Sequence, residues 1–194
     1  MRTFNDGWFC PTNEVYSIVQ DALKRYNVED YGAVHDGVTD DTQVIQKVIN
    51  LCSLTGGEIF FPQGIYIIAG TLQTNVGGIN YKSQLYIPDM NFTSLQRPTI
   101  KFKGEVTPNF VQSNGVGNAI TPNSGVILRS TINSTTPYSF ILASKGNPLN
   151  YRNYNYSTVI VEDIQFQVNV SANKASLGGI GFNYGSNHIV RNVC

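Results

Sequence analysis

Three carboxylates lie within six residues, at Asp36, Asp40 and Asp41, a grouping that could bind a cation, supply acid/base chemistry or stabilise turns. The central Gly and terminal Glu of an EF-hand loop are missing, so the spacing gives calcium no strong motif. Asp36 is followed by Gly37, as in a tight turn, and Asp40 or the neighbouring Thr39 is well placed to cap a following helix. We therefore predict turn and capping roles and no metal site.

Glu162 and Asp163 are adjacent carboxylates on a β-rich segment. A glycosidase needs two carboxyl groups about 5 to 10 Å apart across a sugar, whereas neighbouring strand residues point to opposite faces. A turn is the simpler interpretation, and we assign no catalytic residue. His35 and His188 are the only histidines, and each is interpreted as a turn or stacking residue.

Aromatic residues gather at Tyr151, Tyr154 and Tyr156, with Arg152 among them. Such a group can stack against sugar rings, and these four residues are our candidate substrate-binding set. A loop that packs on the flank of the fold explains the same pattern. The Asn-rich stretch 109–123 is interpreted as a surface loop, and as a binding loop only by hypothesis.

Composition limits the partners. Thirteen basic residues balance thirteen acidic ones, so we expect no nucleic-acid partner. The longest apolar runs are far shorter than the roughly 20 residues of a membrane helix, so we expect no membrane insertion. Cys10, Cys52 and Cys194 lack zinc-site spacing and are interpreted as free, mainly buried thiols of a reducing compartment. No cofactor is implied.

Two segments have helical periodicity. The first begins at Pro11, and the second is predicted for residues 41–54, before Gly56-Gly57. The first would place its apolar residues on one face: Val15, Ile18, Val19, Ala22, Leu23 and Tyr26. Beyond Gly57 the pattern predicts short strands near 58–61, 65–68, 85–87, 99–102, 126–128, 139–143, 158–161, 164–170 and 179–182.

Residues 158–164 and 187–193 share one pattern at an offset of 29 residues: two inward aliphatic positions, a polar pair and a further aliphatic position. Successive turns of a stacked coil repeat similar side chains in this way. The first copy continues with Gln-Phe-Gln-Val, whereas the second is followed only by Cys194. We therefore expect the coil to be truncated here and to continue in a longer protein.

The segment 28–46, VEDYGAVHDGVTDDTQVIQ, followed by Gly56-Gly57 and the strand–turn–strand 58–66, resembles the entry motif of pectate-lyase-like proteins. The resemblance is specific over residues 28–69, although His35 replaces the usual Gly and Val44 the usual Ala. It implies a mainly β fold, a right-handed single-stranded parallel β-helix with an N-terminal capping helix. We expect residues 1–27 to form a docking or capping leader, and 28–194 the start of the coil.

That family includes pectate lyases, polygalacturonases, other polysaccharide hydrolases and phage tail spikes. The resemblance implies a virion tail spike or tail-fibre component that docks to tail or baseplate proteins and recognises host surface polysaccharide. It further implies a homotrimer made in the host cytoplasm, whose parent protein depolymerises the glycan on later rungs or only binds it. The alternatives are a cellular polysaccharide lyase or glycoside hydrolase, for which no export signal is visible, and a non-enzymatic tail adaptor.

Overall fold

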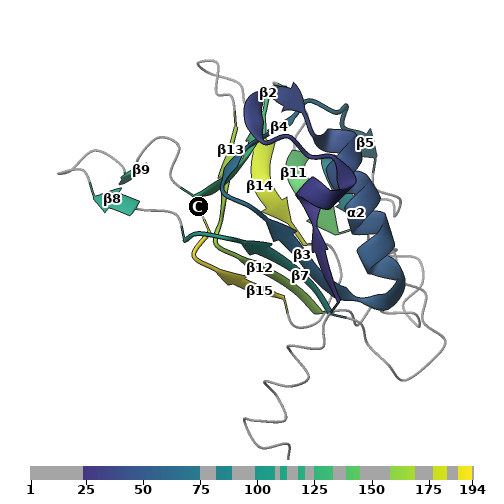
Figure 1. The fold of residues 1–194 in the computed structure, drawn as a ribbon. Helices are drawn as coiled ribbons and strands as arrows, with labels where there is room; N and C mark the ends of the chain where they lie inside the picture. Colours follow the sequence, from purple (N-terminus) through teal and green to yellow (C-terminus); the bar gives the residue numbers. More distant parts are fainter. Residues whose placement is uncertain are drawn as a thin grey trace, which may run out of the picture.

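A computed structural model describes residues 24–74, 82–88, 99–107, 110–112, 118–120, 125–132, 139–144, 158–168, 177–182 and 188–193. In these segments the chain returns turn after turn to three stacked, mainly parallel sheets (Figure 1). The predicted parallel β-helix is confirmed. Most of the helix predicted from Pro11 onward lies outside the described residues. The last residues assigned to that helix are described, and they do not form a helix. Tyr26, placed on the helical face by its periodicity, belongs instead to a short strand.

The first sheet contains five parallel strands. In sheet order they are β1 (Arg25–Asn27), β3 (Gly57–Phe61), β7 (Thr99–Gly104), β12 (Thr158–Glu162) and β15 (Ile189–Arg191). Their register places Ile59 beside Phe102 and Phe102 beside Val161, all facing the core. Because side chains alternate along a strand, the residues between these positions face outward.

In the other two sheets the strands also lie side by side in the order in which they occur along the chain. The second contains β2 (Asp36–Asp40), β4 (Gly64–Ile68), β10 (Val126–Ser130) and β13 (Ile164–Gln167), and the third contains β5 (Gln73–Thr74), β6 (Lys82–Ile87), β11 (Ser139–Ser144) and β14 (Leu177–Gly181). Only β5 in these sheets pairs antiparallel, with β6. A separate antiparallel pair, β8 (Phe110–Gln112) and β9 (Asn118–Ile120), lies outside the coil (Figure 1).

The offset of 29 residues is confirmed by the pairing of β12 with β15. Only one of the two positions predicted to point inward does so: Val161 is buried, whereas Ile160 lies between core-facing residues and faces outward. Ile160 pairs with Ile189 and Val161 with Val190, at the offset that the sequence predicts. Identical or similar aliphatic side chains therefore stack in successive turns. This regularity is local, because the intervals between paired residues of the earlier strands are longer.

Aromatic and aliphatic side chains fill the interior of the coil. Phe61 stacks on Phe102 at 6.4 Å between ring centroids, and its ring is perpendicular to that of Tyr66 at 5.4 Å between centroids. The hydroxyl of Tyr66, inside the core, donates to the carbonyl oxygen of Pro62 at 2.8 Å. Each turn thus contributes large side chains to one continuous hydrophobic core.

The helix predicted for residues 41–54 is α2 (Thr42–Thr55), preceded by a short 3₁₀ helix, η1 (Val28–Tyr31). Its inner face is fully buried and contains Ile45, Val48, Ile49 and Cys52. Cys52 is a free thiol, and burial raises its pKa to about 12, so it packs as a small apolar side chain. Among the described residues, no helix has the length and apolar character needed to cross a membrane.

Helix α2 also bonds to the main chain of the third sheet. The side-chain amide of Gln46 donates to the carbonyl oxygen of Tyr86 and accepts from its N–H, both at 2.9 Å. One glutamine thereby reproduces the pair of bonds that a neighbouring strand would make with β6. The helix takes the place of a strand at this end of the coil.

Replacing Gln46 with Ala should lower the free energy of unfolding by about 1–3 kcal/mol, because both hydrogen bonds to β6 are lost. The control is Gln43→Ala, which changes an exposed glutamine of the same helix. Urea denaturation monitored by circular dichroism measures both variants. Equal effects would show that Gln46 adds nothing beyond helix propensity.

Candidate functional site

The three clustered carboxylates bind main-chain amides, as the turn interpretation predicts. Asp36 accepts from the amides of Val38 and Thr39 at 2.8 and 2.7 Å. These bonds, from Thr39 first and then Val38, lower the pKa of Asp36. Asp40 accepts from the first amide of α2, that of Thr42, at 3.0 Å, a local bond made by the residue before the N-cap. The N-cap position itself is held by Asp41, whose side chain makes no cap bond, so the prediction that Asp40 or Thr39 caps the helix is wrong.

Asp41 turns away from the helix that it precedes. Its two carboxylate oxygens accept from the amides of Val34 and His35 at 2.8 and 3.2 Å. Burial raises the pKa of Asp41, and these bonds oppose the rise only in part. The carboxylate ties the entry loop to the start of α2, which is a structural role.

His188 stacks on an aromatic ring and His35 lies at a turn with its ring tilted against another, in agreement with the turn or stacking interpretation. His35 lies 5.3 Å from Tyr66 between ring centroids, and His188 lies 4.2 Å from Phe182 with nearly parallel rings. His35 also has a positive φ of 45°, and its Nε2 lies 2.6 Å from Glu29 Oε1. Burial lowers the pKa of His188, which favours its neutral form.

The candidate sugar-binding residues Tyr151, Arg152, Tyr154 and Tyr156 lie outside the described residues. Their stretch leads directly into β12, which begins at Thr158. Most of the Asn-rich stretch 109–123 likewise lies outside the described residues. Their binding roles remain predictions.

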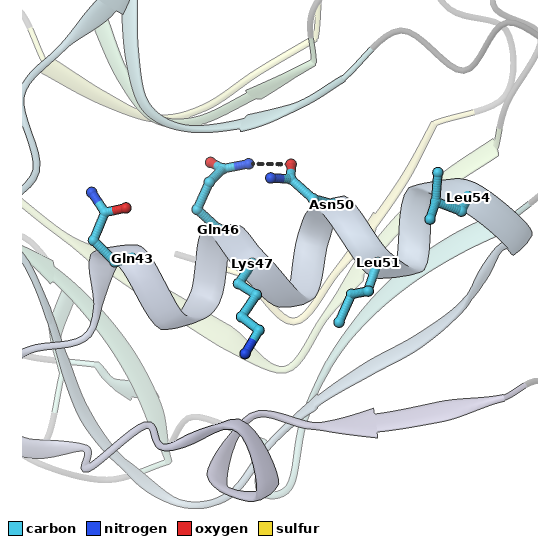
Figure 2. A pocket seen from close by; sticks show the side chains of 6 residues that line it. All are labelled: Gln43, Gln46, Lys47, Asn50, Leu51 and Leu54. Carbon is cyan, nitrogen blue, oxygen red and sulfur yellow. Dashed lines mark hydrogen bonds between the residues drawn. The ribbon is translucent and has the colours of Figure 1, made fainter.

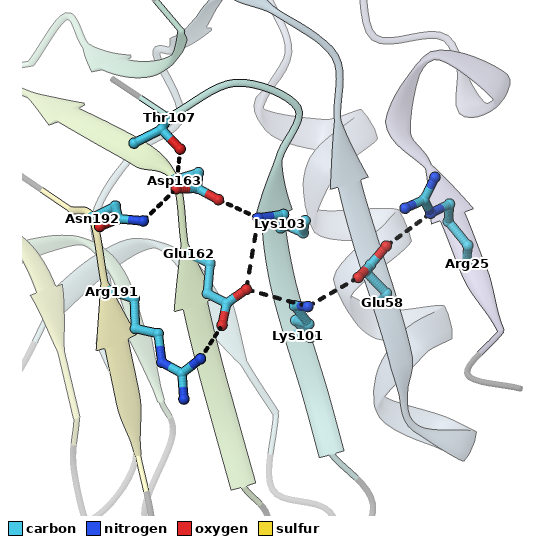
Figure 3. Close-up of polar contacts among 9 residues, drawn as sticks. All are labelled: Arg25, Glu58, Lys101, Lys103, Thr107, Glu162, Asp163, Arg191 and Asn192. Carbon is cyan, nitrogen blue, oxygen red and sulfur yellow. Dashed lines mark hydrogen bonds and ion pairs between the residues drawn. The ribbon is translucent and has the colours of Figure 1, made fainter. Parts of the chain in front are cut away.

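The outer face of the first sheet carries a row of charges that runs across its strands (Figure 3). We call this row the charged ladder: Arg25 on β1, Glu58 on β3, Lys101 and Lys103 on β7, Glu162 on β12 and Arg191 on β15. Basic and acidic strands alternate, so each carboxylate lies between cations of the neighbouring strands.

Every neighbouring pair in the charged ladder is in ionic contact. Glu58 binds Arg25 at 2.8 Å and Lys101 at 3.4 Å. Glu162 lies 3.2 Å from Lys101, 3.7 Å from Lys103 and 3.4 Å from Arg191. The two glutamates are 14% exposed, whereas Arg25 and Arg191 are 57% and 64% exposed. The accessible charge of the ladder is therefore positive and lies at its two ends.

Asp163 anchors one side of the charged ladder at the corner between β12 and β13. It is an ion-pair partner of Lys103 and accepts from Thr107 and Asn192, each at 2.8 Å. Asp163 and Asn192 occupy the same corner in successive turns and both have positive φ, of 58° and 50°. Asp and Asn tolerate this left-handed conformation better than most residues.

Gly104 is required at the neighbouring position of β7. A Cβ atom there would lie 2.0 Å from the carbonyl oxygen of Asp163, closer than any side chain allows. Two steric conditions are thus met at one corner: Asp163 adopts the left-handed backbone conformation in one turn, and Gly104 leaves room for its carbonyl oxygen in the adjoining turn.

The corner keeps Asp163 ionised. Burial by itself would raise its pKa, but the hydrogen bonds from Lys103, Asn192 and Thr107 outweigh burial and lower the pKa. A carboxylate with a lowered pKa is a poor proton donor at neutral pH. The turn interpretation of Glu162-Asp163 is confirmed at Asp163, and Glu162 is a member of the charged ladder.

The charged ladder is not predicted from the sequence, although one part of it leaves a signal there. Lys101 and Lys103 alternate with apolar residues in Thr-Ile-Lys-Phe-Lys, which is a signal for outward-facing positions. Their partners could not be found, because Glu58 and Glu162 lie at unequal distances along the chain.

A family model described as rhamnogalacturonase A/epimerase, pectate lyase-like, matches residues 25–194. Mannuronan C5-epimerase AlgE5 of Azotobacter vinelandii is 41% identical over 63 residues, which are 32% of this chain and 6% of that protein. Alginate lyase 7 of the same organism is 41% identical over 64 residues, 32% of this chain and 8% of that protein. The chain thus matches less than a tenth of the length of these relatives.

Among solved structures, the A-module of A. vinelandii mannuronan C-5 epimerase AlgE4 superposes with a TM-score of 0.50. The aligned residues are 15% identical and cover 88% of this chain and 37% of that module. This likeness supports the fold. It carries no information about catalytic residues.

Replacing Asp163 with Asn tests the corner. The carboxylate has a lowered pKa when folded, so its contribution to stability is present above its unfolded pKa, near 4, and is lost as the pH falls through the lower folded value. We expect Asp163→Asn to lower the free energy of unfolding at pH 7 by about 1–3 kcal/mol and to flatten the decline below pH 4.

The matched control is Asp30→Asn, an identical change at an exposed position of η1. Urea denaturation between pH 2.5 and 7 gives both profiles. An Asp163→Asn profile parallel to that of the unsubstituted chain would contradict the assigned role.

Proposed function

This chain belongs to the rhamnogalacturonase A/epimerase, pectate lyase-like family, and we propose that it forms the first turns of a protein that binds an acidic polysaccharide. The observation that carries the proposal is the charged ladder, whose accessible groups are the guanidinium groups of Arg25 and Arg191. Mannuronan and alginate, named for the relatives, guide the choice of an acidic polymer.

The dimensions of the charged ladder suit an extended polymer. Five strands spaced about 4.8 Å apart cover about 19 Å from β1 to β15. A linear polysaccharide lying across the strands would meet Arg25 at one end and Arg191 at the other. The partly buried glutamates between them would hold the cations in place.

Both arginines retain donors for a ligand. Arg25 uses Nε toward Glu58, and Arg191 uses Nη1 toward Glu162. A guanidinium has five N–H donors, so each side chain keeps several that can bind a sugar carboxylate. The four cations of this surface face three carboxylates, Glu58, Glu162 and Asp163, which leaves a small positive excess for an anionic chain.

For the biological setting, we propose a phage tail spike or tail-fibre component, trimeric, attached to tail or baseplate proteins and directed at host surface polysaccharide. The support is the entry motif of residues 28–69 and the aromatic stretch 151–156 before β12. The parent protein would carry any catalytic groups outside the turns described, because the carboxylates of this surface are all paired with cations.

A cellular polysaccharide-modifying enzyme is the second candidate. It is favoured by the 41% identity with a mannuronan epimerase over 63 residues and with an alginate lyase over 64 residues. In that case the acidic polymer would be a substrate of the whole protein rather than a receptor on a host. A non-enzymatic tail adaptor of the same fold would bind no polymer at all.

The double variant Arg25→Ala/Arg191→Ala should weaken binding of the chain to polymannuronate about tenfold, since two charge-assisted contacts are removed. Arg129→Ala is the control, because Arg129 lies on the second sheet, where it donates to Gln167 at 2.9 Å. Isothermal titration at 50 and 200 mM salt measures binding, with dextran as the neutral polymer. Equal binding of dextran, or an equal loss for Arg129→Ala, would contradict the polysaccharide role of the charged ladder.

The virion setting predicts that the parent protein sediments with purified phage particles from its natural source. Peptide mapping of the particle fraction and of the clarified medium decides this directly. Recovery only from the medium, as a free enzyme that changes polymannuronate, would support the cellular enzyme instead.

A further inference from the structure

The outer face of the first sheet also carries an aromatic side chain, Phe60 on β3. Its neighbours Ile59 and Phe61 are fully buried, so Phe60 points outward together with the charged ladder. The strand register places it between Asn27 and Lys103 of the adjoining strands. An uncharged ring therefore lies among the ion pairs of this surface.

This ring and Glu58 hold the guanidinium group of Arg25 from two directions. The Cζ atom of Arg25 lies 4.3 Å from the centroid of the Phe60 ring, within the range of a cation–π contact. The Nε of Arg25 donates to Glu58 Oε1 at 2.8 Å, and Glu58 Oε2 lies 3.4 Å from Lys101 Nζ (Figure 3). The guanidinium is thus held in one orientation, although 57% of the Arg25 side chain is exposed.

Arg25 keeps the edge of its guanidinium that suits a carboxylate. Its contact with Glu58 uses Nε, and the other four of the five N–H donors lie on Nη1 and Nη2. Two parallel N–H groups of this edge match the two oxygens of a carboxylate, which gives a planar bidentate contact. A side chain that is ordered before the ligand arrives also avoids the entropy cost of ordering it on binding.

Arg191, at the other end of the charged ladder, is arranged differently. Its contact with Glu162 uses Nη1, at 3.4 Å, so one group of the corresponding edge already faces a carboxylate. Among the described residues, cations lie over the rings of Tyr26, Phe60 and Tyr31, and none of these cations is Arg191. The two arginines therefore differ in what they offer to a ligand, although both side chains are exposed.

We propose that Phe60 is a positioning residue, which holds the Arg25 guanidinium ready for bidentate binding of one uronate carboxylate of the polymer. The Arg25 end of the charged ladder then fixes how the chain of sugars lies, whereas Arg191 contributes charge attraction. This inference rests on the proposed binding of an acidic polysaccharide, and it adds the contact that selects a planar carboxylate.

Isothermal titration with polymannuronate tests the role of Phe60. Phe60→Leu keeps an apolar side chain but removes the ring, and it should weaken binding about threefold, the share of one arginine in the loss of about tenfold expected for two. Phe60→Tyr keeps the ring and should bind as the unsubstituted chain does. Because Phe60→Leu removes no charge, the salt dependence of binding should stay the same, whereas Arg25→Ala should make it shallower.

Two further variants separate positioning from other roles. Arg25→Lys keeps the charge but lacks the planar fork, so it too should bind about threefold more weakly, with unchanged salt dependence. In the Arg25→Ala background, Phe60→Leu should cause no further loss, because the ring acts through Arg25.

The matched control is Tyr31→Leu, which removes the ring of another cation–π pair. Lys47 projects from α2 (Figure 2), and its Nζ lies 6.0 Å from the centroid of the Tyr31 ring. Neither residue belongs to the charged ladder, so Tyr31→Leu should leave the affinity for polymannuronate unchanged. An equal loss for Tyr31→Leu would show a general effect of removing a ring and would overturn the positioning role.

The remaining outcomes are distinct. Binding of polymannuronate that Phe60→Leu or Arg25→Lys leaves unchanged would overturn the positioning role while the proposed function stands. A further loss on adding Phe60→Leu to Arg25→Ala would also overturn it, in favour of direct stacking of Phe60 on a sugar ring. If the unsubstituted chain does not bind polymannuronate, the proposed function fails and this inference fails with it.

Discussion

The structure depends on closing the end of a parallel coil. Where such a coil begins, the first strands expose unpaired main-chain groups and the apolar core opens to water. Residues 24–56 meet both demands: Lys24 and Asp41 bond to the main chain of β3 and β4, Gln46 bonds to β6, and the inner face of α2 covers the core. The three carboxylates that look like a metal or catalytic cluster hold this closure together.

Once the end is closed, strand register determines the outer surface. A parallel sheet places outward residues of successive turns about 4.8 Å apart, so charges at equivalent positions must alternate or repel. The charged ladder satisfies that requirement in two register rows, Arg25–Glu58–Lys101 and Lys103–Glu162–Arg191. The contact between Lys101 and Glu162 joins the two rows, and Asp163 at the corner pairs with Lys103. The same register leaves guanidinium groups accessible at both ends, and the proposal of an acidic polymer as ligand rests on these groups.

The entry motif, α2 and the pairing at an offset of 29 residues could be predicted from the sequence, because each rests on local pattern. The charged ladder could not, since Glu58 is in register with Lys101, and Lys103 with Glu162, although the intervals along the chain between these partners are unequal. Tyr26 was assigned to a helix because a strand of three residues is too short to interrupt a helical period. The predicted aromatic set at 151–156 falls in a segment that the structure does not describe, so its role stays a prediction.

The central claim is that the charged ladder is a binding surface for an acidic polysaccharide. A crystal structure of the chain with a mannuronate oligosaccharide tests this most directly. The account predicts sugar density across the first sheet, with carboxylates at the guanidinium groups of Arg25 and Arg191. Sugar density at any other surface, with the charged ladder bare, would contradict it.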